Sequence, residues 1–476
     1  MPTFDTYHSK KTPIIKRSVM KSQLLSLLKR DDCDYIEIRL EDTIHTQIKL
    51  SGKDIENVAE NCAYGGNVRA LYKGGWSFVS FDTLSDIEAK VDMAVAQARE
   101  IGNRISAKSQ LAKVDPIVDT YKIEPITDVR DVPLTKKMDT LLNYNEIMMT
   151  ASPDIKSTNV FYKDAWIKQI FANSEGTYIE QEKMDMGCNM YAIASKGGRT
   201  EYFGTSVGSS NDWSKILGFE KAVEEKAKIA AGLLTADKPK SGNYTVILNP
   251  KLAGTFIHEA FGHLSEGDNV YENPELAQVM SMGREFGRPL LNVYDTGLDL
   301  GVRGFLKYDD EGVPTEKTYL IREGKLVGRL HSRETAGKMG ERPTGSARAI
   351  NYKFPPIPRM RNTCIQVGNT DPEEMIADVK NGLLCVDVFG GQTNGEMFTF
   401  KSGMAWKIEN GKKTEMLAGP LLQGNVFSTL KNIDMVGTDY EDPDAAGGCG
   451  KGGQMPLPTT HGSPSVRIHD VVVSGK

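Results

Sequence analysis

Residues 257–268, Ile-His-Glu-Ala-Phe-Gly-His-Leu-Ser-Glu-Gly-Asp, constrain this chain most, because they place two of its seven histidines close to three carboxylates. A helix start precedes them. Asn249 suits the N-cap, and Pro250 suits the first helical position, where a backbone N–H would have no partner. Apolar residues then recur at helical spacing, at Leu252, Ala253, Phe256 and Ala260. We therefore expect His258 and Glu259 to lie on a helix that packs against a core.

The two histidines are spaced as His258-Glu259-x-x-x-His263, one residue wider than the His-Glu-x-x-His pattern of zinc metalloproteases. In that chemistry neutral imidazoles bind a divalent metal, and the glutamate removes a proton from a metal-bound water. Positions five apart on a regular α-helix point about 140° apart, which suits two ligands of one ion poorly. We therefore expect the helix to widen or to end near Gly262. A buried core histidine and a surface histidine are the alternatives to a metal site.

A single cysteine near the C-terminus, Cys449, lies in the glycine-rich stretch 447–454. A thiolate there would complete a tetrahedral set of two imidazoles and one sulfur, with one position left for water or a substrate carbonyl. The alternative is a free thiol in a flexible loop. Glu266 is another candidate for the third ligand, although a thiolate suits Zn²⁺ better. Glu266 and Asp268 are otherwise expected either to orient an imidazole or to form a solvated turn.

Seven stretches of the C-terminal half resemble the TldD/PmbA family, once named for the modulation of DNA gyrase, and they occur in the family's order. They are residues 258–268, 310–314, 343–345, 358–363, 390–392, 435–437 and 449–454. A weaker match at residues 66–70, with Phe78 and a long helix after it, extends the resemblance to the N-terminal part. The intact histidine–glutamate motif resembles the TldD type, because the PmbA (TldE) type lacks this motif.

The resemblance implies a metalloprotease, a peptide hydrolase of the His-Glu-x-x-x-His type, that acts on unfolded or unstructured peptides. It implies that His258, His263 and Cys449 hold one divalent metal, expected to be zinc, with Glu259 as the catalytic base. It also implies a dimer, either a homodimer or a heterodimer with a related subunit. The sequence departs from the family where Arg348 is followed by Ala349 instead of a second arginine.

Two other functions stay open at this point. A non-catalytic peptide-binding or scaffold subunit would use the metal structurally, although a four-ligand structural site requires no glutamate beside its first histidine. A metal hydrolase with a substrate other than peptides is the second alternative. Neither the motif nor the resemblance assigns substrate-binding residues.

Five further side chains complete the sequence-based expectations. Arg348 and Arg359 are candidates for holding a substrate carboxylate or peptide carbonyls, but we expect them to form structural ion pairs. His331 lies in a charged stretch, residues 329–333, and is expected at the surface. His461 and His469 receive no role.

Composition excludes several classes of protein. A chain of 476 residues is too long for one ordinary core, so two or three domains are expected. With a net charge of −5 and no basic stripe, we expect no nucleic-acid partner. No run of apolar residues is long enough to cross a membrane, and residues 1–16 contain no apolar signal segment. The six scattered cysteines suggest reduced thiols and a cytoplasmic location.

The N-terminal region, residues 1–236, contains two similar orders of helix, strands and long helix, within residues 18–103 and 134–236. Residues 35–41 alternate as a half-buried strand, a second strand is expected around residues 46–50, and a hairpin around residues 73–75. Ser85 and Glu88 suggest a capping box for the following helix, and Gly102 its end. Residues 104–133 are expected to connect the two units.

Past a boundary at residues 237–242, short apolar runs alternate with glycine and proline turns. Asn410-Gly411 is a strong hairpin signal, and residues 322–324 suggest another hairpin. The prediction is an α+β protein. Its N-terminal region, residues 1–236, combines an antiparallel or mixed sheet with long helices. Its C-terminal region, residues 237–476, is β-rich and carries the metal-site helix.

Overall fold

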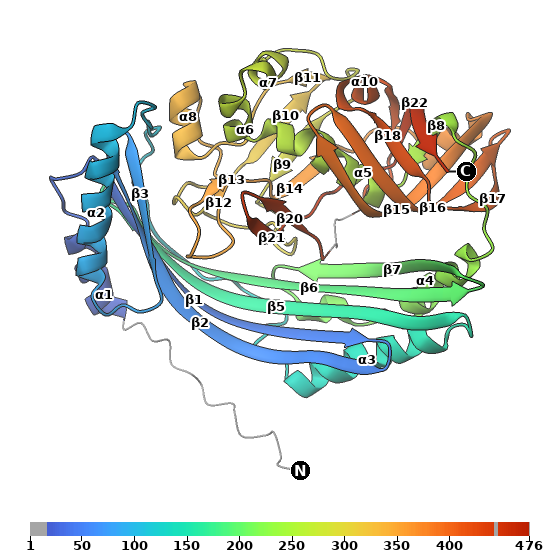
Figure 1. Ribbon diagram of the computed structural model, residues 1–476, viewed down its shortest axis with the longest axis horizontal. Coiled ribbons are helices and arrows are strands. Elements are labelled where there is room, and N and C mark those ends of the chain that lie inside the picture. The colour runs from blue at the N-terminus through green and yellow to red at the C-terminus, as the bar shows by residue number, and fades with distance from the viewer. Residues whose placement is uncertain (1–16, 442–445, 476) are drawn as a thin grey trace, which may run out of the picture.

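The computed structural model describes residues 17–441 and 446–475. It combines helices with extensive β-sheets, so the predicted α+β class is confirmed. A long, curved N-terminal sheet lies beneath a compact C-terminal half, which sits in the concave side of the sheet (Figure 1). Among the described residues, no helix is long and apolar enough to cross a membrane.

The N-terminal sheet joins the strands of both predicted N-terminal units. Its order is β3-β2-β1-β5-β6-β4, and β7 pairs with β6. The strands are β1 (Tyr35–Ser51), β2 (Asp54–Tyr72), β3 (Gly75–Phe81), β4 (Val118–Tyr121), β5 (Ile155–Asn173), β6 (Tyr178–Lys196) and β7 (Arg199–Ser209). The hairpin expected around residues 73–75 connects β2 to β3. The division into segments 18–103 and 134–236 stays a prediction.

Strand β1 is longer than the two short strands expected at residues 35–41 and 46–50. It pairs with β2 on one side and with β5 on the other over nearly its full length. The polar residues between the two expected strands therefore find backbone partners on both sides, so the strand continues through them. The alternation of apolar and polar residues indicated the two ends of β1 but gave no sign that one strand joins them.

Four helices cover the two ends of this sheet on its convex side (Figure 1). They are α1 (Arg17–Leu27), α2 (Ile87–Arg104), α3 (Leu134–Thr150) and α4 (Glu220–Leu233). The helices α1 and α2 share one apolar cluster with β1 to β3, whereas α3 and α4 share another with β5 to β7. A single 3₁₀ turn, Trp213–Ile216, precedes α4.

Both expected ends of α2 are wrong. Asp86, in a left-handed conformation, holds the N-cap position without a side-chain cap, so Ser85 and Glu88 form no capping box there. Gly102 lies inside the helix and does not end it. A Cβ at Gly102 would lie 1.9 Å from the carbonyl oxygen of Tyr72, so this glycine lets the helix approach the β2–β3 hairpin. The connector, residues 104–133, contributes β4, which pairs in parallel with β6.

A β-barrel forms the centre of the C-terminal half. Its strands pair in the order β15-β8-β22-β18-β16, and β16 pairs back to β15. They are β8 (Gly242–Leu248), β15 (Asn381–Asn394), β16 (Met397–Glu409), β18 (Leu421–Asn425) and β22 (Val466–Ser474). Strands β17 (Lys412–Ala418) and β19 (Ile433–Val436) extend it, and the turn at Asn410-Gly411 connects β16 to β17 as predicted. Helices α9 (Pro372–Ala377) and α10 (Val426–Lys431) flank the barrel.

Smaller elements surround the barrel. One sheet contains β9 (Val293–Thr296), β10 (Lys317–Arg322), β11 (Lys325–Leu326) and β14 (Asn362–Ile365). Two short ribbons pair β12 (Ala347–Arg348) with β13 (Ile357–Pro358), and β20 (Gly448–Lys451) with β21 (Gln454–Pro458). The helices are α5 (Pro250–Ile257), α6 (Gly267–Glu272), α7 (Pro274–Val279) and α8 (Arg333–Met339). The predicted hairpin at residues 322–324 joins β10 to β11.

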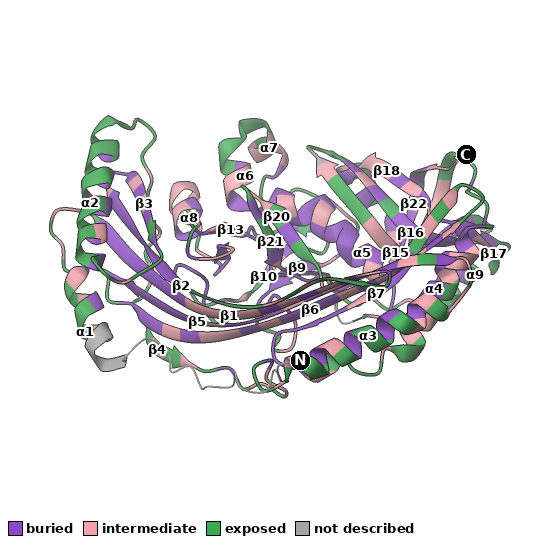
Figure 2. Cartoon of the chain, turned by 60° about the horizontal axis from the view of Figure 1, so that its bottom comes forward, coloured by how far each residue is buried: buried purple, intermediate pink, exposed green. Residues whose placement is uncertain are grey.

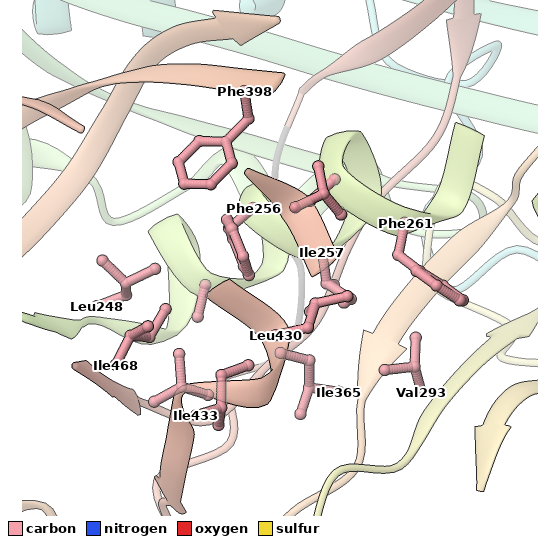
Figure 3. Packing of buried hydrophobic residues seen from close by; sticks show 14 of the residues in the cluster. Leu248, Phe256, Ile257, Phe261, Val293, Ile365, Phe398, Leu430, Ile433 and Ile468 are labelled. Carbon is pink, nitrogen blue, oxygen red and sulfur yellow. The ribbon is translucent and has the colours of Figure 1, made fainter. Parts of the chain in front are cut away.

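The helix α5 follows β8 directly and is packed into the largest apolar cluster of the protein. Figure 3 shows Phe256, Ile257 and Phe261 among the side chains of this cluster, which also includes Leu248 and Val293. These residues are at most 2% exposed. The core therefore fixes the helix on the side away from its polar residues.

Buried charges join the C-terminal half to the middle of the N-terminal sheet, which Figure 2 shows largely buried. Asp310 accepts hydrogen bonds from Gln169 (2.7 Å) and Lys183 (3.2 Å) and lies 3.4 Å from Arg39. Glu311 accepts a hydrogen bond from Arg69 at 2.7 Å. The motif at residues 310–314 therefore holds the two halves together through Asp310 and Glu311.

Candidate metal centre

The backbone changes its winding at the histidine motif. The α-helix α5 begins with Asn249 as its N-cap, whose side chain accepts from the N–H of Leu252, and it ends at Ile257. Residues His258–Gly262 then form a π-turn, in which the N–H of His263 donates to the carbonyl of His258. The predicted widening near Gly262 is confirmed. It brings positions five apart onto one face, and the centroids of the two imidazole rings lie 5.3 Å apart.

Gly262 allows this turn to pack closely, because Met360 leaves no space for a side chain at position 262. A Cβ at this position would lie 2.0 Å from the sulfur of Met360. Met360 is itself fully buried within the cluster that surrounds α5. The turn can therefore rest directly on the β13–β14 segment.

Three donor side chains converge on the open side of the π-turn. His258, His263 and Cys449 each offer one ligand atom, and these atoms all lie within 4.8 Å of one another. The sulfur of Cys449 lies 3.2 Å from Nε2 of His263. The cysteine comes from β20, so the chain returns to the motif helix as the sequence analysis required. Among the described residues, no further histidine, cysteine or acid belongs to this group.

The donor set fits a divalent metal. Nδ1 of His258 is buried and has no hydrogen-bond partner within the described part of the chain. Burial lowers the pKa of His258 well below its usual value, which keeps this imidazole neutral. Two neutral imidazoles and a thiolate are the ligand types that Zn²⁺ prefers.

Glu259 lies beside the three donors without belonging to them. Its Oε2 lies 4.0 Å from Nε2 of His263, and its side chain is 27% exposed. Burial raises the pKa of this carboxyl. Glu259 is therefore a partly accessible acid whose affinity for a proton is increased.

A buried carboxylate orients His263. Glu266 accepts a hydrogen bond from Nδ1 of His263 at 3.0 Å, and Lys451 lies 3.1 Å from the same oxygen. This contact leaves Nε2 of His263 facing Cys449. Burial lowers the pKa of His263, but hydrogen bonds with Cys449 and Glu266 outweigh it and raise this pKa to about 10. A divalent ion therefore has to displace a proton here. Glu266 therefore contacts the imidazole of a donor, which is one of the three roles considered for it from the sequence.

Lys451 connects the cysteine strand to the motif helix. Its ammonium donates to Asp268 (2.6 Å) and to the carbonyl of Pro358 (3.0 Å), in addition to its contact with Glu266. Asp268 is thus an ion-pair partner and not a solvated turn residue. Lys451 belongs to the matched stretch 449–454, and its position two residues after Cys449 is the one signal in the sequence for this contact.

Arg348 and Arg359 donate to backbone carbonyls, so the expected ion pairs are wrong. Arg359 donates to the carbonyl of Cys449 at 2.8 Å, and Arg348 donates to those of Met360 (2.6 Å) and Pro458 (2.7 Å). Within the described ranges neither guanidinium has a carboxylate within 4 Å. The physical reason is that backbone carbonyls of Cys449, Pro458 and Met360 lie within reach and accept from the two guanidinium groups. Arg359 thereby holds the backbone of Cys449 in place.

The position expected for His331 is wrong, and His461 makes a contact for which no expectation was stated. His331, expected at the surface, is 1% exposed and contacts Thr335 and Glu341, each at 3.0 Å. Its charged neighbours are buried with it, since Arg329 pairs with Glu341. His461, which received no role, lies with its ring centroid 5.4 Å from that of His258. Nothing in the local sequence around residue 461 indicated this contact.

Comparisons with known proteins agree with this geometry. Residues 36–101, 127–234 and 241–475 match domain 1, the central domain and the C-terminal domain of the PmbA/TldA metallopeptidases. A metalloprotease of Synechocystis sp. is 42% identical over 448 residues, covering 94% of this chain and 96% of its own length. A zinc metalloprotease TldD homolog of Saccharolobus solfataricus is 27% identical, covering 93% and 96%.

The fold also has relatives of known structure. TldE of Thermococcus kodakarensis superposes with a TM-score of 0.74 and 17% identity, covering 96% of this chain and all of its own. At that identity the likeness shows the fold alone. The domain matches and the Synechocystis relative, each spanning most of the sequence, show that the chain belongs to the PmbA/TldD family of metallopeptidases.

Proposed function

We propose that this protein hydrolyses unfolded or unstructured peptides with one divalent ion, Zn²⁺, held by His258, His263 and Cys449. The observation that carries the proposal is the convergence of these three donors within 4.8 Å beside the partly exposed Glu259. A relative named as a zinc metalloprotease supports the choice of metal. Three protein ligands leave one tetrahedral position open, as a catalytic site requires.

A divalent ion at this position would supply Lewis-acid chemistry, which lowers the pKa of a water molecule and polarises a carbonyl. Glu259 acts as the base: its carboxylate accepts the proton of the attacking water and returns it to the leaving amine. The raised pKa of Glu259 suits this exchange, because a base works best when its pKa approaches the working pH.

Other side chains position the donors and contact no reacting atom in this scheme. Glu266 fixes the ring of His263, and Lys451 holds Glu266 in turn. Arg359 fixes the backbone at Cys449. A small reorientation of any donor would change the geometry at the ion, so these residues are positioning residues.

The test is mass spectrometry of an unfolded peptide mixture after incubation with the purified protein. Wild type, Glu259→Gln and a control, Glu201→Gln, are compared after their metal content is measured. Glu201 lies on β7 and pairs with Arg199 in the N-terminal sheet, so the control removes an equivalent charge away from the three donors. We expect cleavage by the wild type and the control, and none by Glu259→Gln.

Three results would contradict the proposal. Equal cleavage by Glu259→Gln would exclude Glu259 as the base. Loss of metal from Glu259→Gln would make Glu259 a ligand. Absence of cleavage in all three, with metal retained and a related subunit added, would favour the alternative of a peptide-binding subunit with a structural metal.

We also propose that the chain works as a dimer in the cytoplasm, either with itself or with a related subunit. The existence of a relative named TldE, with the same fold, supports a search for such a partner. The six cysteines form no disulfide in the described parts of the chain, which is consistent with a reducing compartment. Light scattering of the purified protein is the test of self-association, and a monomer would leave only the related subunit as partner.

A further inference from the structure

The C-terminal half contains a cavity of about 480 Å³ at the β10–β11 hairpin. Residues of β10, the segment 327–331 and the segment 341–344 line it. Its volume lies within the range of small-molecule sites. None of the metal-donor residues belongs to its lining.

Two cations at this cavity lack a carboxylate partner. Lys317 and Arg322 are exposed residues at the two ends of β10, and neither has an acidic group within 4 Å among residues 17–441 and 446–475. Lys317 instead lies over the ring of Tyr294, with Nζ at 3.6 Å from its centroid, and Arg322 lies over that of Tyr319 at 4.1 Å. Their charges are therefore available to a ligand.

A third cation lines the cavity from a buried position. Arg329 is 6% exposed, pairs with Glu341 and donates to the carbonyl of Met280, but its Nε has no partner within the described structure. A buried N–H group without a partner is uncommon in folded proteins, because it loses its hydrogen bonds to water without replacing them. A fourth cation, Arg342, pairs with Glu316. Four cations thus face one lining acid, Glu341.

We propose that this cavity binds a small organic anion whose carboxylate or phosphate group contacts Lys317, Arg322 and Arg329. Arginine and lysine recognise both groups through charge-assisted hydrogen bonds, and arginine does so with two parallel donors. The rings of Tyr294 and Tyr319 support the two outer cations, Lys317 and Arg322 respectively. The proposal stands independently of the peptidase function.

The cavity lies behind the metal centre, on the other side of the segment that precedes α8. Leu330 of this segment donates to the carbonyl of Ser265 at 2.9 Å, and its own carbonyl accepts from Gly267 at 2.8 Å. These two hydrogen bonds enclose Glu266, which orients His263. A ligand here is therefore separated from the donors by one stretch of backbone and occupies a second site.

Isothermal titration calorimetry of the metal-loaded protein tests the proposal, with inorganic phosphate and succinate as separate probes at fixed ionic strength. The test variant is Lys317→Gln/Arg322→Gln. The control is Lys401→Gln/Arg99→Gln, which removes the same two charges from exposed cations that lie over Tyr202 and Tyr72. Lys317→Arg/Arg322→Lys retains both charges at the cavity.

We expect the wild type, the control and the charge-retaining variant to bind the probe alike, and the test variant to bind at least about tenfold more weakly. Binding of phosphate alone would identify phosphate esters as the ligand class, and binding of succinate would identify carboxylates. The proposal is overturned if the wild type binds neither probe at millimolar concentration. It is also overturned if the test variant and the control bind equally, because the probe then occupies another site such as the metal.

Discussion

Asp310 and Glu259 are two acids from the motif stretches of the same chain, and their surroundings are opposite. Asp310 is 3% exposed, and four groups contact its oxygens: Gln169, Lys183, Arg39 and the N–H of Ala349. Glu259 accepts no hydrogen bond from any described residue, and a quarter of its side chain is exposed. The oxygens of Asp310 are therefore engaged by protein groups, whereas the oxygens of Glu259 are free to accept a proton.

The pKa values of the two acids follow this difference. Burial alone would raise the pKa of Asp310, but the charges of Lys183 and Arg39 hold it well below its usual range. For Glu259 burial is the larger influence and raises its pKa, although the nearby His263 acts in the opposite direction. Both acids belong to family motifs, so the motif alone does not tell an acid that supports the fold (an architectural acid) from one that can react. The number of carboxylate oxygens already engaged by protein groups does distinguish them.

The largest expected effect is on catalysis at Glu259. Glu259→Gln should lower kcat on an unfolded peptide by about 10²–10⁴-fold, the usual contribution of a general base. Its thermal melting temperature should stay at the wild-type value, because the carboxylate supports no other group. The measurements are peptide hydrolysis and thermal unfolding. A large fall in melting temperature would place Glu259 with the architectural acids.

Asp310→Asn should show the reverse pattern. Removal of its charge leaves the buried Arg39 with only Glu41 and the half-buried Lys183 with no carboxylate among the described residues, which we expect to cost about 3–5 kcal/mol of unfolding free energy. Urea unfolding measures this. The matched control is Asp119→Asn, which breaks the more exposed pair with Lys307 and should cost about 0–1 kcal/mol. Equal losses for the two variants would contradict the architectural role.

Glu266→Gln tests a residue that belongs to both classes, since it is fully buried yet contacts a donor imidazole. We expect metal affinity to fall about 10–100-fold, as for other groups that orient metal ligands. Competition with a chromophoric chelator measures the affinity. Glu272→Gln, an exposed position on α6, is the control. Unchanged affinity in Glu266→Gln would show that His263 needs no orienting partner.

The smallest effect concerns the support of the turn. Gly262→Ala places a methyl group 2.0 Å from the sulfur of Met360, and overpacking of this kind costs about 1–3 kcal/mol. Urea unfolding of Gly262→Ala, Met360→Ala and the double variant gives the coupling between the two sites. The double variant should recover most of the loss caused by the added methyl group. Simple additivity would mean that the clash relaxes elsewhere.

Local patterns in the sequence predicted what depends on neighbouring residues. The start of α5, the widening after His258 and the turn at Asn410-Gly411 each follow from a few adjacent side chains. The continuity of β1 could not be predicted in this way, because pairing with β2 and β5 decides it. The pattern within one strand does not show how far its neighbours pair with it, and this pairing determines the length of β1.

The site shows the same division between local and distant information. The spacing of the motif indicated His258, Glu259 and His263, and the family resemblance added Cys449. The contacts of Lys451 with Glu266, of Arg359 with the backbone of Cys449 and of His461 with His258 join residues far apart in the sequence. The charged stretch around His331 suggested a surface position, but His331 is buried and contacts Thr335 and Glu341, which lie four and ten residues later in the chain.

The hydrogen bond from His263 to the carbonyl of His258 makes the whole segment after it dependent on a single inserted residue. Deletion of one residue between Glu259 and His263 would restore the spacing of the common zinc helix. It would also rotate every later position by about 100° around the axis. Ser265, whose hydroxyl donates to Phe261, and Glu266, which orients His263, would then face other surroundings. The length of this turn therefore sets the register of the rest of the centre, and the two kinds of zinc helix cannot be interconverted by shortening alone.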